Sequence, residues 1–203
     1  IGSAQPVGDL LASGVPLVLD VAQSLGQVEV PRGAAAYVGT GRKWLCGPRG
    51  VGFGMVAPEW HEQLRPPPTL GSLDQQGMRR YDSNDPHVAG RVALSLAAAP
   101  WCPAVIPVIA AAAGAARVLL DGAGGWQVVE PVTEPTGITT LRHQSADPLA
   151  LRTQLIEEGF VLSAVPLTRS AELRAPVLRV STAAWVTPPD LEALADALEL
   201  LSR

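Results

Sequence analysis

Thr40-Gly41-Arg42-Lys43-Trp44-Leu45-Cys46-Gly47-Pro48-Arg49-Gly50-Val51-Gly52 holds the only lysine of the 203-residue chain, whereas arginine supplies the other 14 of its 15 basic side chains. Arginine equals lysine as a cation, but its guanidinium cannot lose a proton to become a nucleophilic amine. A lysine that burial or a nearby charge keeps partly neutral can attack a carbonyl and form a Schiff base. A single lysine can also survive by chance, so its meaning depends on its neighbours.

Three short apolar runs around this stretch predict strands. Residues 15–20 are predicted to form a fully buried strand of a parallel sheet, with Asp20 at its carboxyl end. Residues 34–39 and 51–56 predict two further strands, the second entered through a glycine-rich turn. Ligands of open α/β sheets bind beyond the carboxyl ends of strands. Asp20 and the segment 40–43 both follow such ends and are therefore candidate site residues.

The rest of the chain predicts further helices and a second domain. Helices are expected at 87–98, 104–120 and 147–158, and strands at 126–130, 138–143, 160–164 and 177–181. A closing helix is capped by Thr187 and presents an apolar face made by Leu191, Leu194, Leu198 and Leu201.

The glycines at 122–125 predict the domain boundary. We therefore expect an α/β protein with part of a large, mostly parallel domain at 1–122 and a small C-terminal α+β domain at 123–203. A parallel sheet needs cover on both faces, so part of the large domain is expected to lie outside this sequence.

Composition limits the possible partners. The net charge of −4 gives no reason to expect nucleic acid or an anionic membrane. The longest apolar run, 104–116, contains Pro107 and is too short to span a bilayer. Two cysteines, Cys46 and Cys102, with no CxxC or Cys/His cluster, predict neither a disulfide framework nor a metal site. These features favour a cytoplasmic protein, and a start at Ile1 without methionine favours a piece of a longer one.

Taken together, Asp20-Val21-Ala22-Gln23, the lysine segment and Gly47-Pro48-Arg49-Gly50-Val51-Gly52 resemble class V aminotransferases, which are fold-type I enzymes dependent on pyridoxal 5'-phosphate (PLP). The resemblance implies that Lys43 binds the cofactor aldehyde and then acts as the catalytic base at the substrate Cα. It assigns Asp20 to the pyridine nitrogen, Gln23 to the phenolic oxygen and Ala22 to the ring face.

The same resemblance assigns the remaining site residues. Thr40 matches the hydroxyl that contacts the cofactor phosphate, and Arg179 matches the arginine that binds the substrate carboxylate. Arg42 stands where the family commonly has histidine and adds a fixed charge near the phosphate. Residues 82–86 stand where a loop reaches the partner subunit's phosphate, and Asp85 replaces the usual threonine, so Ser83 or Asn84 is left to make that contact. A homodimer is implied, because both chains contribute loops to each active site in this family.

Each residue also has a structural interpretation. Asp20 and Thr40 could be turn residues, Gln23 a solvated amide, Arg179 an exposed strand residue and Trp185 a packing residue, although an indole can also bind a trimethylammonium group.

Four reactions are known alternatives within the family, and the desulfurase reaction is disfavoured. Cysteine desulfurases carry a nucleophilic cysteine shortly before the substrate arginine, and residues 161–174 contain none. The lysine segment and residues 178–185 most resemble a carbon–sulfur lyase of ergothioneine biosynthesis, which implies elimination of a sulfur group from Cβ. An aminotransferase, an epimerase of the isopenicillin N type and a non-catalytic fragment are the alternatives.

Overall fold

The computed structural model describes residues 2–65, 75–82 and 85–202 and divides them into two compact units. One unit is Pro6–Pro103 and the other combines Ile1–Gln5 with Ala104–Arg203. The second unit contains helix α3, which the predicted boundary at 122–125 assigned to the first domain. The reason is packing, because Ala116 and Leu120 of α3 belong to the same buried cluster as Leu198 near the C-terminus.

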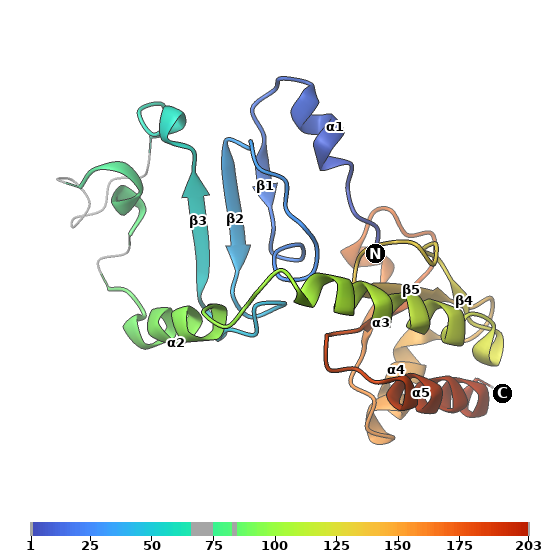
Figure 1. Cartoon of the computed structure of the whole chain (residues 1–203). Helices are drawn as coiled ribbons and strands as arrows, with labels where there is room; N and C mark the ends of the chain where they lie inside the picture. The colour runs from blue at the N-terminus through green and yellow to red at the C-terminus, as the bar shows by residue number, and fades with distance from the viewer. Residues whose placement is uncertain (1, 66–74, 83–84, 203) are drawn as a thin grey trace. The chain divides into compact units, whose positions relative to one another are not determined.

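The first unit is built on a three-stranded sheet in the order β1-β2-β3 (Figure 1). Strand β1 (Val18–Asp20) runs parallel to β2 (Ala36–Thr40), and β2 pairs antiparallel with β3 (Gly52–Val56). The prediction of a mostly parallel sheet therefore fails for the β2–β3 pair. A parallel pair needs a crossover connection of a dozen or more residues. Residues 41–51, called the lysine loop below, instead connect two neighbouring antiparallel strands and so form a hairpin.

The prediction that residues 15–20 form a fully buried strand is wrong for the described part of the chain. Val18 is 68% exposed, and Val38 on the next strand is 43% exposed. These two side chains share one face of the sheet, while Met55, 51% exposed, lies on the other. The apolar sequence predicts that other residues pack on both faces of the sheet, whereas the described residues leave parts of both faces exposed.

Helices flank this sheet. Helix α1 (Val7–Ala12) precedes β1, and α2 (Val88–Ala98) follows the short 3₁₀ helices Pro58–Trp60 and Gly77–Tyr81. The start of α2 is tied to the segment before it by an ion pair between Arg91 and Asp82, at 3.1 Å. Both side chains are about half exposed, and pairs of this kind stabilise by at most about 1 kcal/mol.

The second unit packs helices against a four-stranded antiparallel sheet in the order β4-β5-β7-β6. Its elements in chain order are α3 (Val105–Leu120), the 3₁₀ helix Ala123–Gly125, β4 (Gln127–Val128), β5 (Ile138–Arg142), α4 (Pro148–Glu157), β6 (Ser163–Val165), the 3₁₀ helix Leu167–Arg169, β7 (Val177–Ser181) and α5 (Pro188–Leu201). The positions agree with the predicted elements to within a few residues.

The core of the second unit lies between its sheet and its helices. Trp126, Leu141, Leu155, Leu178 and Leu198 are fully buried there. Arg117 is also buried, and it donates to the carbonyl oxygens of Glu134 and Thr136, both at 2.6 Å. Burial lowers the pKa of Arg117, against the opposite pull of two nearby carboxylates.

The caps of α4 and α5 follow their sequence signals. The Asp147 carboxylate accepts the backbone N–H of Leu149 at 2.9 Å, and Pro148 opens α4. Thr187 and Asp190 form a capping box at the start of α5. Leu191, Leu194 and Leu198 are buried on one face of that helix, as the leucine spacing predicts.

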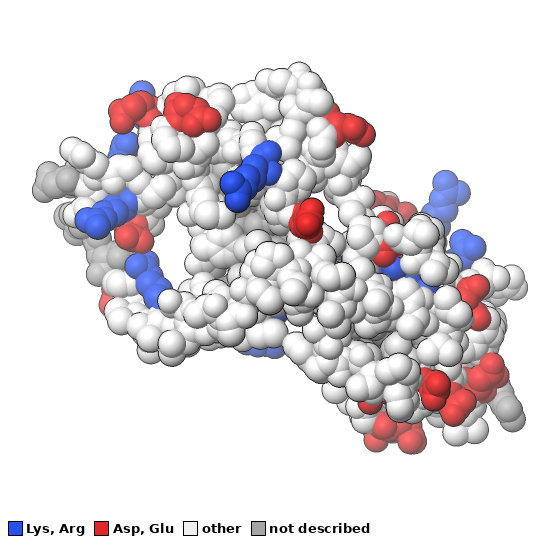
Figure 2. Space-filling view, in the orientation of Figure 1, with Lys and Arg blue, Asp and Glu red and all other residues white. Residues whose placement is uncertain are grey.

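Surface charge is unevenly distributed. Figure 2 shows acidic side chains gathered over the end of the chain that carries α5, and interspersed charges over the strands of the first unit. Among the described residues, no helix is both long enough and apolar enough to cross a bilayer. No group of three or more His, Cys, Asp or Glu side chains in that part of the chain is arranged to hold a metal ion.

Candidate active site

The carboxyl ends of β1 and β2 bring Asp20 and Thr40 to one edge of the sheet. Asp20 lies opposite Val38 in the parallel register, and Thr40 is two residues further along β2. Because side chains alternate along a strand, Asp20, Val38 and Thr40 share one face. Asp20 Oδ1 accepts the backbone N–H of Ala22 at 2.8 Å, and Oδ2 accepts no hydrogen bond from the described part of the chain. The carboxylate is thus held by one oxygen and exposed at the sheet edge.

The segment between β2 and β3 forms a closed loop around Lys43. Gly41 N–H donates to Val51 O at 3.0 Å, and Gly47 N–H donates to Gly41 O at 2.7 Å. Within the loop, Cys46 N–H donates to Lys43 O at 2.9 Å. These bonds fix the backbone of the lysine, whose side chain is partly buried.

Helix α2 supports this loop through Leu94. A Cβ atom added to Gly41 would lie 2.4 Å from Leu94 Cδ1, and one added to Gly47 would lie 2.8 Å from the same atom. The two glycines therefore let one leucine of α2 pack directly against the backbone on both sides of the lysine turn. This contact accounts for glycine at both positions of the motif.

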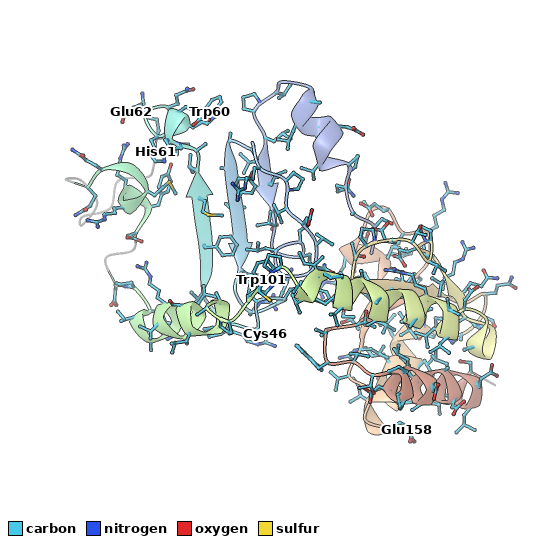
Figure 3. All side chains as sticks on the ribbon, in the orientation of Figure 1. Cys46, Trp60, His61, Glu62, Trp101 and Glu158 are labelled. Carbon is cyan, nitrogen blue, oxygen red and sulfur yellow. The ribbon has the colours of Figure 1, made fainter. Side chains whose placement is uncertain are left out.

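A side-chain hydrogen bond joins the aspartate motif to the lysine loop. Trp44 Nε1 donates to Gln23 Oε1 at 3.2 Å, across 21 residues of sequence. The Gln23 side chain predicted to contact the cofactor is therefore bonded to the residue that follows the lysine. Trp101, which Figure 3 labels, donates from Nε1 to Gly26 O in the same turn, at 3.4 Å.

The other predicted cofactor residues lie around this edge. Ala22 follows Asp20 in the turn and is partly buried. Thr40 Oγ1 donates to Val51 O at 3.4 Å, a long bond that holds the hydroxyl only loosely. Arg42 is exposed in the loop next to Lys43. Ser83 and Asn84, the candidates for a contact with a partner subunit, lie outside the described residues.

Arg179 belongs to the second unit, where it lies in the middle of β7. Its Nη2 donates weakly to Ser163 Oγ on β6, at 3.4 Å, and its buried Nε has no hydrogen-bond partner in the described part of the chain. Burial lowers the pKa of Arg179, and the positive charge of Arg169 lowers it further. A half-buried guanidinium with an unused donor and a like charge nearby suits an anionic group such as a carboxylate.

Sequence reasoning overlooked three contributors. Leu94 and Trp44 resemble ordinary apolar residues in a helix and a loop, and only the fold shows what they contact. Arg169 lies within residues 161–174, the segment where cysteine desulfurases have their nucleophilic cysteine, so its position in the sequence could have indicated a role near the substrate. Trp185, expected mainly to pack, is 71% exposed, so packing does not account for it within the described residues.

Comparison with known proteins supports the resemblance, although no family model matches the chain. The chain is 38% identical over 198 residues to a probable hercynylcysteine sulfoxide lyase of Mycobacterium tuberculosis (strain CDC 1551 / Oshkosh), covering 91% of this chain and 49% of that protein. It is 30% identical over 217 residues to the isopenicillin N epimerase of Amycolatopsis lactamdurans, covering 94% of this chain and 53% of the relative. The chain thus spans about half the length of the curated relatives it matches.

Solved structures identify the fold. The apo cysteine desulfurase of Thermococcus onnurineus NA1 superposes with a TM-score of 0.85 at 18% identity, over 98% of this chain and 56% of that one. The chain therefore has the fold of the cysteine desulfurases. A lysine-to-alanine mutant of C-DES, solved with glycine covalently linked to its PLP cofactor, matches with a TM-score of 0.76 at 17% identity, over 91% of this chain and 51% of that one.

The residues of the first unit fit the chemistry of PLP. Asp20 provides an exposed carboxylate with Oδ2 available for a pyridinium N–H. Gln23 has its amide oxygen engaged and so offers its Nε2 as a donor. A hydroxyl from Thr40 and a single amine from Lys43 complete a donor set suited to a phosphate and an aldehyde.

Proposed function

We propose that the complete protein is a PLP-dependent carbon–sulfur lyase that cleaves hercynylcysteine sulfoxide into a sulfur-bearing precursor of ergothioneine, pyruvate and ammonia. The 38% identity to a probable hercynylcysteine sulfoxide lyase supports the substrate. The observation that supports a PLP site is the bonded pair of motifs, in which Trp44 of the lysine loop donates to Gln23 of the aspartate turn.

The proposed roles follow the chemistry of each side chain. PLP, when bound, supplies an electron sink for the pair released at the substrate Cα. Lys43 would hold the cofactor through its amine and then remove the Cα proton as a general base. Asp20 would keep the pyridine nitrogen protonated, Ala22 would pack on the ring, and Thr40 and Arg42 would hold the phosphate.

Arg179 would orient the amino-acid end of the substrate. Its planar guanidinium binds a carboxylate through two parallel N–H bonds, which fixes direction as well as position. Loss of the Cα proton and cleavage of the Cβ–S bond then leave a three-carbon fragment. Water converts this fragment to pyruvate and ammonia, while the sulfur leaves on the imidazole ring as a sulfenic acid that needs reduction to become ergothioneine.

The positions of the cysteines argue against a persulfide mechanism. Residues 161–174 contain Arg169 but no cysteine. Cys46 and Cys102 are exposed and lie in the other unit. A variant with Cys46→Gly and Cys102→Ser is therefore expected to keep its lyase activity, whereas a desulfurase that used either cysteine as its nucleophile would lose its activity.

The test of the function uses full-length protein, hercynylcysteine sulfoxide and an assay for pyruvate. Pyruvate released without an added keto acid supports the lyase. Turnover only with a keto acid indicates an aminotransferase, and racemisation at Cα without pyruvate indicates an epimerase, the alternative favoured by the 30% identical relative. A colourless protein, unchanged in every assay by Lys43→Ala, would indicate a non-catalytic protein.

We further propose that the complete subunit is a cytoplasmic homodimer. The exposed apolar side chains of β1–β3, such as Val18 and Met55, are the kind of surface that further chain or a partner covers. Sedimentation of full-length protein tests the number of subunits. A monomer that binds PLP would contradict the proposed dimer but not the proposed cofactor.

A further inference from the structure

The orientation of the Gln23 amide is fixed by chemistry. An indole N–H is a donor and never an acceptor. Trp44 Nε1, 3.2 Å from the Gln23 side chain, therefore requires the amide oxygen on its own side. The NH₂ group then points away from the indole, and it is the donor that Gln23 offers to groups on that side.

Several contacts hold this pair in place. The buried Gln27 side chain donates from Nε2 to the backbone oxygen of Gln23, which fixes the start of the turn. Gly26 has a φ of +100°, and a Cβ there would lie 2.9 Å from Trp44 Cβ. Only glycine suits both demands. Trp101 also donates to the oxygen of Gly26, at 3.4 Å, but this bond reaches neither side chain of the Gln23–Trp44 pair.

We propose that Trp44 is a positioning residue that holds Gln23 with its NH₂ directed at the cofactor's phenolic oxygen. The inference rests on the proposed function, since it assumes PLP at this edge of the sheet. The phenolic oxygen of PLP is anionic when the cofactor is bound to lysine, so it requires a donor. A Gln23 free to rotate would offer its carbonyl oxygen part of the time, and that contact is repulsive.

The sign of the effect follows from this contact. A hydrogen bond donated to an anionic oxygen favours its charged form and lowers the pKa of the proton that it shares with Lys43 nitrogen. Loss of the donor raises that pKa. One neutral hydrogen bond is worth about a twofold to tenfold change in an equilibrium constant.

The experiment compares Trp44→Phe, Gln23→Ala and the double variant in full-length protein. PLP is titrated into the apoprotein to obtain its dissociation constant, and the visible absorbance of each holoprotein is followed against pH. Trp44→Phe keeps an aromatic ring but removes the N–H. It is expected to weaken PLP binding about twofold to tenfold and to raise the pKa of the absorbance change, as Gln23→Ala does. The double variant should be no worse than Gln23→Ala, because Trp44 acts through Gln23.

Trp101→Phe is the matched control, since it removes an indole bond to Gly26 rather than to Gln23. It should leave both readouts unchanged. Effects of Trp44→Phe and Gln23→Ala that add, or a Trp44→Phe variant identical to wild type, would overturn the inference. A wild-type protein with no visible absorbance in the presence of PLP, or a Gln23→Ala variant without effect, would instead refute the proposed cofactor site.

Discussion

Gly52 at the start of β3 lies directly against the backbone of Gly39 on β2: a Cβ added to Gly52 would be 2.5 Å from the Gly39 carbonyl oxygen. That oxygen belongs to the strand and cannot move as a side chain can. The last glycine of the Gly47-Pro48-Arg49-Gly50-Val51-Gly52 motif is therefore needed to close the hairpin that carries Lys43.

Gly52→Ala is expected to lower the free energy of unfolding by about 1–3 kcal/mol, because an atom is forced into a packed contact. Gly54→Ala, two residues along the same strand, is the control, since a Cβ there would meet nothing within 4 Å. It should change stability by no more than about 0.5 kcal/mol. Denaturant unfolding of the two variants measures the difference, and equal midpoints would contradict the contact.

Cys46 has a φ of +54°, the only positive value at a non-glycine residue in the described chain. The left-handed conformation costs an L-residue about 1–2 kcal/mol, whereas glycine in the unfolded state has about 0.5–1 kcal/mol more entropy to lose. Cys46→Gly should therefore stabilise the loop by up to about 1 kcal/mol, and the β-branched Cys46→Val should destabilise it. Thermal unfolding of both variants gives the order, and a Cys46→Val variant as stable as Cys46→Gly would show that the loop relaxes.

Arg179→Lys should raise KM for the sulfoxide substrate about tenfold to a hundredfold, because a charge-assisted bond of about 1.5–3 kcal/mol is lost with the bidentate geometry. Arg169→Gln should raise KM less, since Arg169 is exposed and its charge is screened. Steady-state kinetics of full-length protein distinguish them. A larger increase in KM for Arg169→Gln than for Arg179→Lys would indicate that the substrate carboxylate binds at Arg169 and not at Arg179 on β7.

The sequence predicted the elements well where the pattern was local. The leucine spacing and the Thr187 cap placed α5, and the glycine-rich motif placed β3. It misjudged the burial of β1, because Val18 is apolar enough for a buried strand although the described residues leave it 68% exposed. It also missed that β2 and β3 run antiparallel, since apolar composition carries no information about direction.

The site was predictable in its residue types and not in its contacts. Asp20, Gln23 and Lys43 stand in a specific order along the chain, which a resemblance can detect. The bond between Gln23 and Trp44 joins residues 21 apart, and the packing of Leu94 on Gly41 joins residues further apart still. No periodicity or spacing indicates such pairs, because they depend on how the loop closes.

Asp190 makes the stability of α5 dependent on pH. Thr187 donates to its carboxylate from the hydroxyl at 2.6 Å and from the backbone at 2.8 Å, and these bonds lower the pKa of Asp190. A lowered pKa means that the stabilisation is complete above the unfolded value of about 3.9 and is lost as the pH falls through the folded value. Asp190→Asn should thus reduce Tm at pH 7 and have little effect at pH 2. Glu192→Gln on the same helix is the control, and an equal pH dependence for both would contradict the cap.

Lys43 can be identified as the cofactor-binding amine by mass spectrometry. Borohydride reduces the bond between a lysine amine and the PLP aldehyde to a stable secondary amine, and trypsin no longer cuts after that lysine. Cleavage at Arg42 and Arg49 should then yield the peptide 43–49 carrying the cofactor. Lys43→Arg keeps the positive charge but has no amine that can react, so it should give the same peptide region without label. Label recovered only on other amines of the full-length protein would exclude Lys43 and with it the proposed chemistry of the loop.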